Sequence, residues 1–280
     1  MTKREKTPRE YRGINDEIRE QTKKFKDMTL KEKWEYFWEY YKINVLIIAL
    51  VATFVISMIY NFVTAKDYCF NGMLLNASMM DQEKIADAFA DYAGFDTDTY
   101  DCFIDASSTL SYQNPSEYEM ATAQRIIAEI QSKELDAMVF DAEVFYNYAF
   151  NQVFMDLREV YTADELAAFE GQIYYIDKAV IRRAEESEAE TGESYSLNSL
   201  TPEEVIEEAK THRDPSTMEE PIPVGIFVEE SPFAEKSNAY LGVVPIYGIS
   251  STSQRVEAAK TFLCFLFDET VDFANMYTEF

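Results

Sequence analysis

Apolar residues are concentrated near the amino-terminal end of this chain, in one long stretch. No charged residue occurs between Lys42 and Lys66, and most positions of 43–63 are Ile, Leu, Val, Ala, Phe or Met. A helix of about 20 such residues is long enough to cross the hydrocarbon core of a bilayer. The pattern therefore predicts a transmembrane helix over residues 43–63.

A shorter amphipathic pattern precedes this stretch. Thr29, followed three residues later by Glu32, has the form of a capping box, which predicts a helix over residues 29–42. Four aromatic residues repeat there at i, i+3, i+4 and i+7 and form one stripe: Trp34, Phe37, Trp38 and Tyr41. Trp and Tyr favour the membrane interface, so one interpretation is an interfacial segment that fixes the depth of the transmembrane helix in the bilayer. The alternative is a docking face for another membrane protein.

After residue 64 the pattern changes to short strands alternating with helices. Strands are predicted at 68–75, 100–104 and 135–140, and this alternation favours parallel pairing. The helices between these strands are predicted over 81–92 and from a cap at Asn114 onward, the second with an apolar stripe of Met120, Ala123, Ile127 and Ile130. The later elements are expected in this order: helix 142–161, a capped helix from Thr162, strands 172–176, 222–228 and 240–247, and helix 253–268.

Two segments lack a regular apolar pattern. Residues 1–28 are charged and almost free of apolar side chains, so we expect a mobile tail. Residues 184–221 include an acidic run and are predicted to form a solvated insertion, with one short helix starting at the capping box of Thr201 and Glu204. The predicted organisation is a tail (1–28), an interfacial helix (29–42), a transmembrane helix (43–63) and an α/β domain (64–280) that contains the insertion 184–221.

Charge predicts the orientation of the span. Lysines are frequent just before it and rare just after it: Lys23, Lys24, Lys26, Lys31, Lys33 and Lys42 against Lys66. The positive-inside rule then places the amino terminus in the cytoplasm and residues 64–280 outside. Residues 64–280 carry 13 basic and 42 acidic side chains, a net charge of −29, which argues against a nucleic-acid partner.

A cleaved signal peptide is the alternative to a permanent anchor. Residues 63–65 (Val-Thr-Ala) have the small-residue pattern that precedes a cleavage site, which would follow Ala65. The apolar run is longer than a usual signal core of about 7–15 residues, so the sequence favours the uncleaved anchor.

Residues typical of catalysis and of cofactor binding are scarce. The single histidine, His212, is in a polar stretch and is interpreted as a solvated loop residue. The chain has eight glycines and no G-x-G-x-x-G or Walker A motif. We therefore expect no enzymatic activity, no catalytic residue and no cofactor.

A metal site is not expected either. Four acidic residues occur close together, but without the glycine and glutamate of an EF-hand loop, so a solvated acidic turn is favoured over a calcium site: Asp96, Asp98, Asp101 and Asp105.

The three cysteines, Cys69, Cys102 and Cys264, are far apart and lack metal-ligand spacing. Cys69 and Cys102 fall on the first two predicted strands, where an outside location would permit a disulfide. Free buried thiols are the favoured alternative, because strand pairs rarely have the geometry that a disulfide requires.

Three patches of the outer part resemble a known family. Residues 136–141 (DAMVFD) followed by a helix and residues 155–157 (MDL) resemble the middle of extracytoplasmic solute-binding proteins of the type II periplasmic-binding class. Residues 258–263 (AAKTFL) are similar to a late helix of that class. The aromatic stripe followed by a single transmembrane helix resembles membrane-anchored surface proteins of Gram-positive bacteria.

The resemblance implies a shortened periplasmic-binding-like α/β domain that captures a small polar solute without catalysis and works with the permease of an ABC transporter. The alternative is an adaptor, an outer subunit of a membrane complex with a degenerate pocket. The expected partners are thus the lipid bilayer, a small solute, and a permease or another membrane protein.

In open parallel sheets, ligands bind beyond the carboxyl ends of the strands. The candidate ligand-binding residues are the polar and aromatic side chains near these predicted ends: Asn76, Ser78, Asp105, Ser107, Ser108, Asp141, Tyr146 and Tyr247. Their hydroxyl, amide and carboxylate groups suit a polar, cationic solute.

Overall fold

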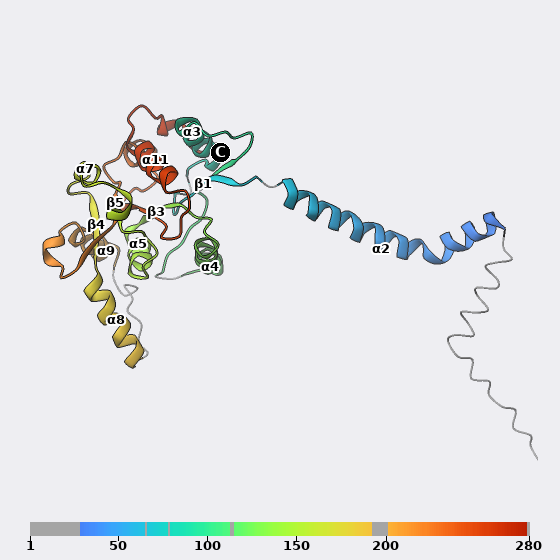
Figure 1. The fold of residues 1–280 in the computed structure, drawn as a ribbon, viewed down its shortest axis with the longest axis horizontal. Coiled ribbons are helices and arrows are strands. Elements are labelled where there is room, and N and C mark those ends of the chain that lie inside the picture. Colours follow the sequence, from blue (N-terminus) through green and yellow to red (C-terminus); the bar gives the residue numbers. More distant parts are fainter. Residues whose placement is uncertain (1–28, 65, 78, 113–114, 192–200, 279–280) are drawn as a thin grey trace, which may run out of the picture. The chain divides into compact units, whose positions relative to one another are not determined.

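The computed structural model describes residues 29–64, 66–77, 79–112, 115–191 and 201–278 (Figure 1). The chain divides into two compact units at the junction of Ala65 and Lys66. Four predictions lie outside the described residues: the tail 1–28, cleavage after Ala65, the candidate Ser78 and the helix cap at Asn114.

In the first unit the described residues form one helix, α2 (Leu30–Thr64). The predicted capping box is present: the Thr29 N–H donates to Glu32 Oε2 at 2.8 Å, and the Glu32 N–H donates to Thr29 Oγ1 at 3.4 Å. Residues 29–42 and 43–63 belong to this single helix and are not separate elements, because neither glycine nor proline interrupts α2.

Residues Tyr41–Asn61 of α2 have a mean hydropathy of 2.5, and none of this stretch is buried against the rest of the chain. Within the described ranges, α2 is the one helix that is long and apolar enough, by length and composition, to cross a membrane. The predicted transmembrane segment, residues 43–63, overlaps this stretch but begins and ends two residues later in the chain.

The predicted aromatic stripe forms on the first turns of α2. The rings of Trp34 and Trp38 stack with centroids 6.2 Å apart, and those of Phe37 and Tyr41 stack at 5.7 Å. Trp34 and Trp38 remain 65% and 56% exposed. The stripe is therefore a continuous exposed aromatic face.

The described residues of the second unit form a mixed six-stranded sheet in the order β2-β1-β3-β6-β5-β4. In chain order the strands are β1 (Tyr68–Leu74), β2 (Asp101–Asp105), β3 (Ala137–Asp141), β4 (Ile173–Asp177), β5 (Pro221–Phe227) and β6 (Pro245–Ile249). β1 pairs in parallel with both β2 and β3, as predicted. β6 runs antiparallel to both β3 and β5, and β4 runs antiparallel to β5. The α/β class is confirmed, with a sheet that is mixed.

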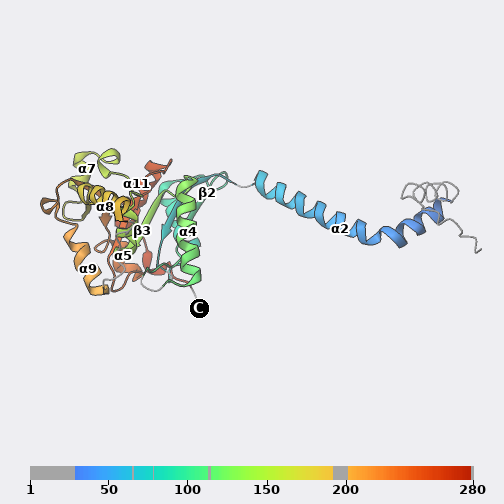
Figure 2. The same cartoon turned by 90° about the horizontal axis from the view of Figure 1, so that it is seen from below.

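Helices cover both faces of the sheet (Figures 1 and 2). One face is covered by α3 (Gln82–Ala93), α6 (Leu157–Val160), α7 (Ala163–Ala167), α10 (Pro232–Ser237) and α11 (Val256–Phe267). The other face is covered by α4 (Glu117–Gln131), α5 (Ala142–Phe150), α8 (Lys178–Thr191) and α9 (Pro202–Thr211). Figure 2 shows α4 in front of the strands. Alternate residues of each central strand supply the two separate apolar cores, as the two-residue period of a strand requires.

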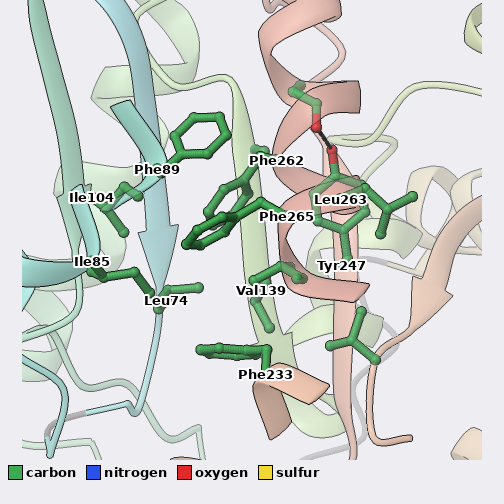
Figure 3. Close-up of a cluster of buried hydrophobic side chains, with 14 of the residues drawn as sticks. Leu74, Ile85, Phe89, Ile104, Val139, Phe233, Tyr247, Phe262, Leu263 and Phe265 are labelled. Carbon is green, nitrogen blue, oxygen red and sulfur yellow. Dashed lines mark hydrogen bonds between the residues drawn. The ribbon is translucent and has the colours of Figure 1, made fainter. Parts of the chain in front are cut away.

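The core beneath α3 and α11 is aromatic. The ring of Phe70 on β1 lies 4.8 Å from Phe89 and 4.9 Å from Phe262, and Phe89 lies 5.4 Å from Phe265. Figure 3 shows the rings of Phe89, Phe262 and Phe265 gathered above the strands. Each fully buried ring contributes roughly 1.5–3 kcal/mol of burial free energy, so this cluster holds the two helices on the sheet.

Two predicted boundaries were wrong. The helix predicted over 142–161 ends at Phe150, because Gln152 takes a positive φ of 56° and Phe154 stacks on Phe145 with ring centroids 4.2 Å apart. The strand predicted over 240–247 begins only at Pro245, because Gly242 adopts a φ of 80° in the preceding turn.

The apolar stripe predicted for α4 was correct only in part, at Ala123 and Ile130. Met120 and Ile127 are about half exposed, whereas Ile126 and Ile130 are buried. Ser116 caps this helix with a complete capping box.

The predicted solvated insertion 184–221 is corrected by the structure. The helix α8 continues into it as far as Thr191, and α9 begins at the predicted capping box of Thr201. Val205 and Ala209 of α9 are 7% and 4% exposed and belong to the core on this face. The acidic residues had suggested a free arm, but the apolar residues spaced one helical turn apart anchor α9 to the domain.

Candidate functional site

A cavity of about 270 Å³ lies at the carboxyl ends of β1 and β3. The sequence predicted a ligand site at these strand ends. Its polar lining consists of Asn76, Ser111, Asp141 and Glu143. Its apolar walls come from α9 and from the loop that precedes β6. Two of the candidate residues, Asn76 and Asp141, are thus brought together at one cavity.

Asp141 is both the last residue of β3 and the N-cap of α5. Its Oδ1 accepts the N–H of Val144 at 3.2 Å, and its Oδ2 accepts Nδ2 of Asn76 at 2.5 Å. Burial raises the pKa of Asp141, while the hydrogen bonds from Asn76 and from backbone N–H groups act in the opposite direction. No Lys or Arg in the described part of the chain forms an ion pair with Asp141, so its negative charge is not compensated there.

Asn76 connects the cavity to the segment after β2. Its Nδ2 donates to the carbonyl of Leu110 at 2.9 Å, and its Oδ1 accepts the N–H of Leu110 at 2.9 Å. The residue adopts a positive φ of 64°, which asparagine tolerates better than most side chains. These contacts hold the amide in place against Asp141.

Glu143 places a second carboxylate at the same cavity. Its Oε1 accepts the N–H of Tyr112 at 3.2 Å. Two carboxylates beside one cavity, with apolar walls opposite, form an arrangement that suits a cation with a short hydrocarbon body.

The candidates Asp105, Ser107 and Ser108 form a separate network that does not line this cavity. Asp105 is 2% exposed and accepts the Ser107 N–H at 2.9 Å and the Ser108 hydroxyl at 2.7 Å. The guanidinium of Arg125 forms an ion pair with the same carboxylate.

Burial acts to raise the pKa of Asp105, but the hydrogen bonds from Ser108 and Arg125 outweigh it, so the pKa is below its ordinary value. The charge of Asp105 is therefore satisfied within the protein. Asp105 also does not belong to a solvated acidic turn with Asp96 and Asp98, as the sequence had suggested.

Tyr146 lies at a second cavity, of about 230 Å³, together with His212. His212 was expected in a solvated loop but is only 8% exposed, because the end of α9 packs on β4. Its Nδ1 lies 2.6 Å from the carbonyl of Tyr175, and its ring stacks on Tyr174 at 4.6 Å. Burial lowers the pKa of His212, so the ring is neutral at physiological pH.

Tyr247 does not join either cavity. It is fully buried, and its hydroxyl donates to the carbonyl of Ala259 in α11 at 2.6 Å (Figure 3). Because β6 is antiparallel to β3, the carboxyl end of β6, near Ser250, lies beside the amino-terminal end of β3. Asp141 lies at the other end of these strands. Tyr247, a candidate ligand-binding residue, therefore lies away from the cavity at Asp141.

The site also contains residues that the sequence reasoning missed. Ser111 and Glu143 line the cavity, and α9 supplies part of its wall. Glu143 follows the candidate Asp141 by two positions, a spacing that places both at the start of one helix. The wall from α9 was missed because the segment 184–221 was interpreted as solvated.

Comparisons with known proteins give no relative: no protein-family model, no curated protein and no solved structure matches this chain.

Proposed function

We propose that this chain is a single-pass membrane protein whose second unit faces the outside of the cell and binds a small cationic solute without catalysis. The observation that carries the proposal is the buried carboxylate of Asp141, which lines a cavity and has no ion-pair partner among the described residues. A buried charge without a partner is unfavourable, so a cation that enters the cavity gains both an ion pair and hydrogen bonds.

The dimensions of the cavity restrict the solute. A volume of about 270 Å³ is at the small end of the range for ligand pockets, which suits a molecule the size of an amino acid or a short amine. Asp141 and Glu143 would receive the ammonium group, and the side chains of Val205 and Val243 would contact the hydrocarbon part.

The helix α2 supports the membrane attachment, because it offers an apolar stretch of sufficient length preceded by lysines. A tethered binding domain of this kind would deliver its solute to a transporter permease, as in an ABC transporter. The competing proposal is an adaptor that contacts another membrane protein through the exposed stripe of Trp34 and Trp38, and it predicts no solute binding.

A thermal-shift screen of the full chain in detergent micelles tests solute binding. The panel contains short amines, amino acids, sugars and metal cations, and unfolding is followed by circular dichroism, since Trp34 and Trp38 are both on α2 and do not report on the domain. We expect ammonium-bearing solutes to raise the unfolding temperature. Asp141→Asn should weaken that binding about tenfold or more, because it removes the charge while an amide oxygen can still cap α5.

The matched control is Glu257→Gln, which removes one negative charge from the exposed face of α11, away from the cavity. This variant should bind as the wild type does. Absence of any shift for a folded protein, or equal shifts in the wild type and in Asp141→Asn, would contradict the binding proposal and favour the adaptor.

Cys264 provides a natural reporter for the proposed orientation, because it is exposed on α11. A membrane-impermeant maleimide added to intact cells should label the wild-type chain, and Cys264→Ser should remove most of the label. Labelling that appears only after the cells are lysed would show that the domain lies in the cytoplasm.

A further inference from the structure

Two cysteines lie on neighbouring strands at one end of the sheet. Cys69 is on β1 and Cys102 is on β2, one of the two edge strands. The parallel register pairs Phe70 with Cys102 and Tyr68 with Asp101, so the register shifts at Cys69. A bulge of this kind re-aims the side chain of the extra residue, here toward the neighbouring strand.

The thiol of Cys69 points toward the strand that carries Cys102. Sγ of Cys69 lies 3.2 Å from the carbonyl oxygen of Asp101, the residue that precedes Cys102. Each thiol also acts on the pKa of the other, as expected for side chains that lie close together. Neighbouring strands are about 4.8 Å apart, and Cys69 directly precedes Phe70, the register partner of Cys102. This diagonal placement is compatible with the Cα separation of about 4.4–6.8 Å that disulfides adopt.

We infer that Cys69 and Cys102 form a redox-active thiol pair, and that its oxidation to a disulfide clamps the edge strand β2 onto β1. Both residues are free and half-buried in this structure, whereas the third cysteine, Cys264, is exposed and lies on α11. The inference goes beyond solute binding and does not depend on it.

The oxidation requires a disulfide-bearing oxidant, such as oxidised glutathione or a C-x-x-C oxidoreductase. The thiolate of Cys69 attacks one sulfur of the oxidant, which forms a mixed disulfide and releases one thiolate. The thiolate of Cys102 then attacks the sulfur of Cys69, and the second thiolate leaves. The protein loses two protons and two electrons, and the oxidant is reduced to two thiols.

The surroundings of the pair restrain this reaction. Burial raises the pKa of Cys102 to about 12 and also raises that of Cys69. Since the thiolate is the nucleophile, exchange is slow at neutral pH and becomes faster as the pH rises. The pair would therefore respond to a dedicated oxidoreductase more than to small oxidants.

The disulfide would close a loop that contains the whole of α3. Closing such a loop restricts the unfolded chain and stabilises the folded domain. β2 has a paired strand on one side only, so the clamp would hold an edge strand in place. Of the strands in the domain, β1 is also the first to follow α2 in the chain.

Peptide mapping of the full chain in detergent tests the inference. The protein is incubated with oxidised glutathione at mildly alkaline pH, remaining thiols are alkylated, and digests are analysed by mass spectrometry. We expect a linked pair of peptides containing Cys69 and Cys102, lighter than the two thiol peptides by two hydrogen atoms, while Cys264 carries a single glutathione.

The Cys264→Ser variant should give the same linkage and an unfolding temperature several degrees higher in the oxidised than in the reduced form. The inference would be overturned if Cys69 and Cys102 stay unlinked, unmodified or each bearing glutathione, in samples where Cys264 has reacted. This outcome is independent of any effect of Asp141→Asn on solute binding.

Discussion

The ends of β2 and β3 carry chemically identical groups in opposite surroundings. Asp105, at the end of β2, is held by two serines and Arg125, and its pKa is lowered. Asp141, at the end of β3, is buried with an amide donor but no cationic partner among the described residues, and its pKa is raised. Both residues are less than a tenth exposed, but desolvation dominates at Asp141, whereas the partners of Asp105 outweigh it.

The contrast separates a structural carboxylate from one that is available to a ligand. The network around Asp105 fills its hydrogen-bonding capacity from within the protein, and the residue does not line the cavity. Asp141 faces a cavity, and the charge that would complement it is absent from the described residues. A burial pattern or a strand-end position cannot distinguish the two, because both residues satisfy these criteria.

The largest expected effect comes from removing the cation beside Asp105. Arg125→Met should lower the free energy of unfolding by about 2 kcal/mol, less than the 3–5 kcal/mol typical of a broken buried pair because the Arg125 side chain is half exposed. Urea titrations of the full chain in detergent, followed by circular dichroism, would measure it. Since Arg125 helps to lower the pKa of Asp105, the effect should be full above pH about 4 and diminish as the pH falls further.

The matched control for this substitution is Arg158→Met. Arg158 pairs with Asp156 at 2.6 Å, but this carboxylate is 22% exposed, against 3% for Asp105, so the loss should be below about 0.5 kcal/mol. Equal losses of unfolding free energy in the two variants would show that the ion pair with Arg125 does not stabilise buried Asp105 in particular. The contrast between Asp105 and Asp141 would then not hold.

Local features of the chain were predictable because they depend on neighbours in sequence. The capping boxes at Thr29, Thr162 and Thr201 appear as predicted, and each rests on a side chain three residues away. The parallel pairing of the first three strands follows in the same way from the helices that separate them.

Features that depend on distant contacts were not predictable. Nothing local to Tyr247 indicates that β6 is antiparallel to β3, yet this direction moves the residue away from the site. His212 and Val205 are buried because α9 returns to the sheet, whereas the acidic composition of 184–221 indicated a free arm. Asn76 and Asp141 were correctly placed at strand ends, but their hydrogen bond joins residues 65 positions apart in the chain.

The most direct test of the account is the pH dependence of amine binding by the full chain, measured by calorimetry between pH about 4.5 and 7.5 in the wild type and in Asp141→Asn. The ammonium ligand stays protonated over this range, and Glu143 is the other carboxylate at the cavity. We predict that wild-type affinity rises about tenfold as the pH passes through the raised pKa of Asp141, because only the ionised carboxylate pairs with the cation. The variant should bind weakly at every pH. A wild-type affinity that does not change with pH, or one that changes equally in Asp141→Asn, would contradict the assignment of Asp141 as the cation-binding group.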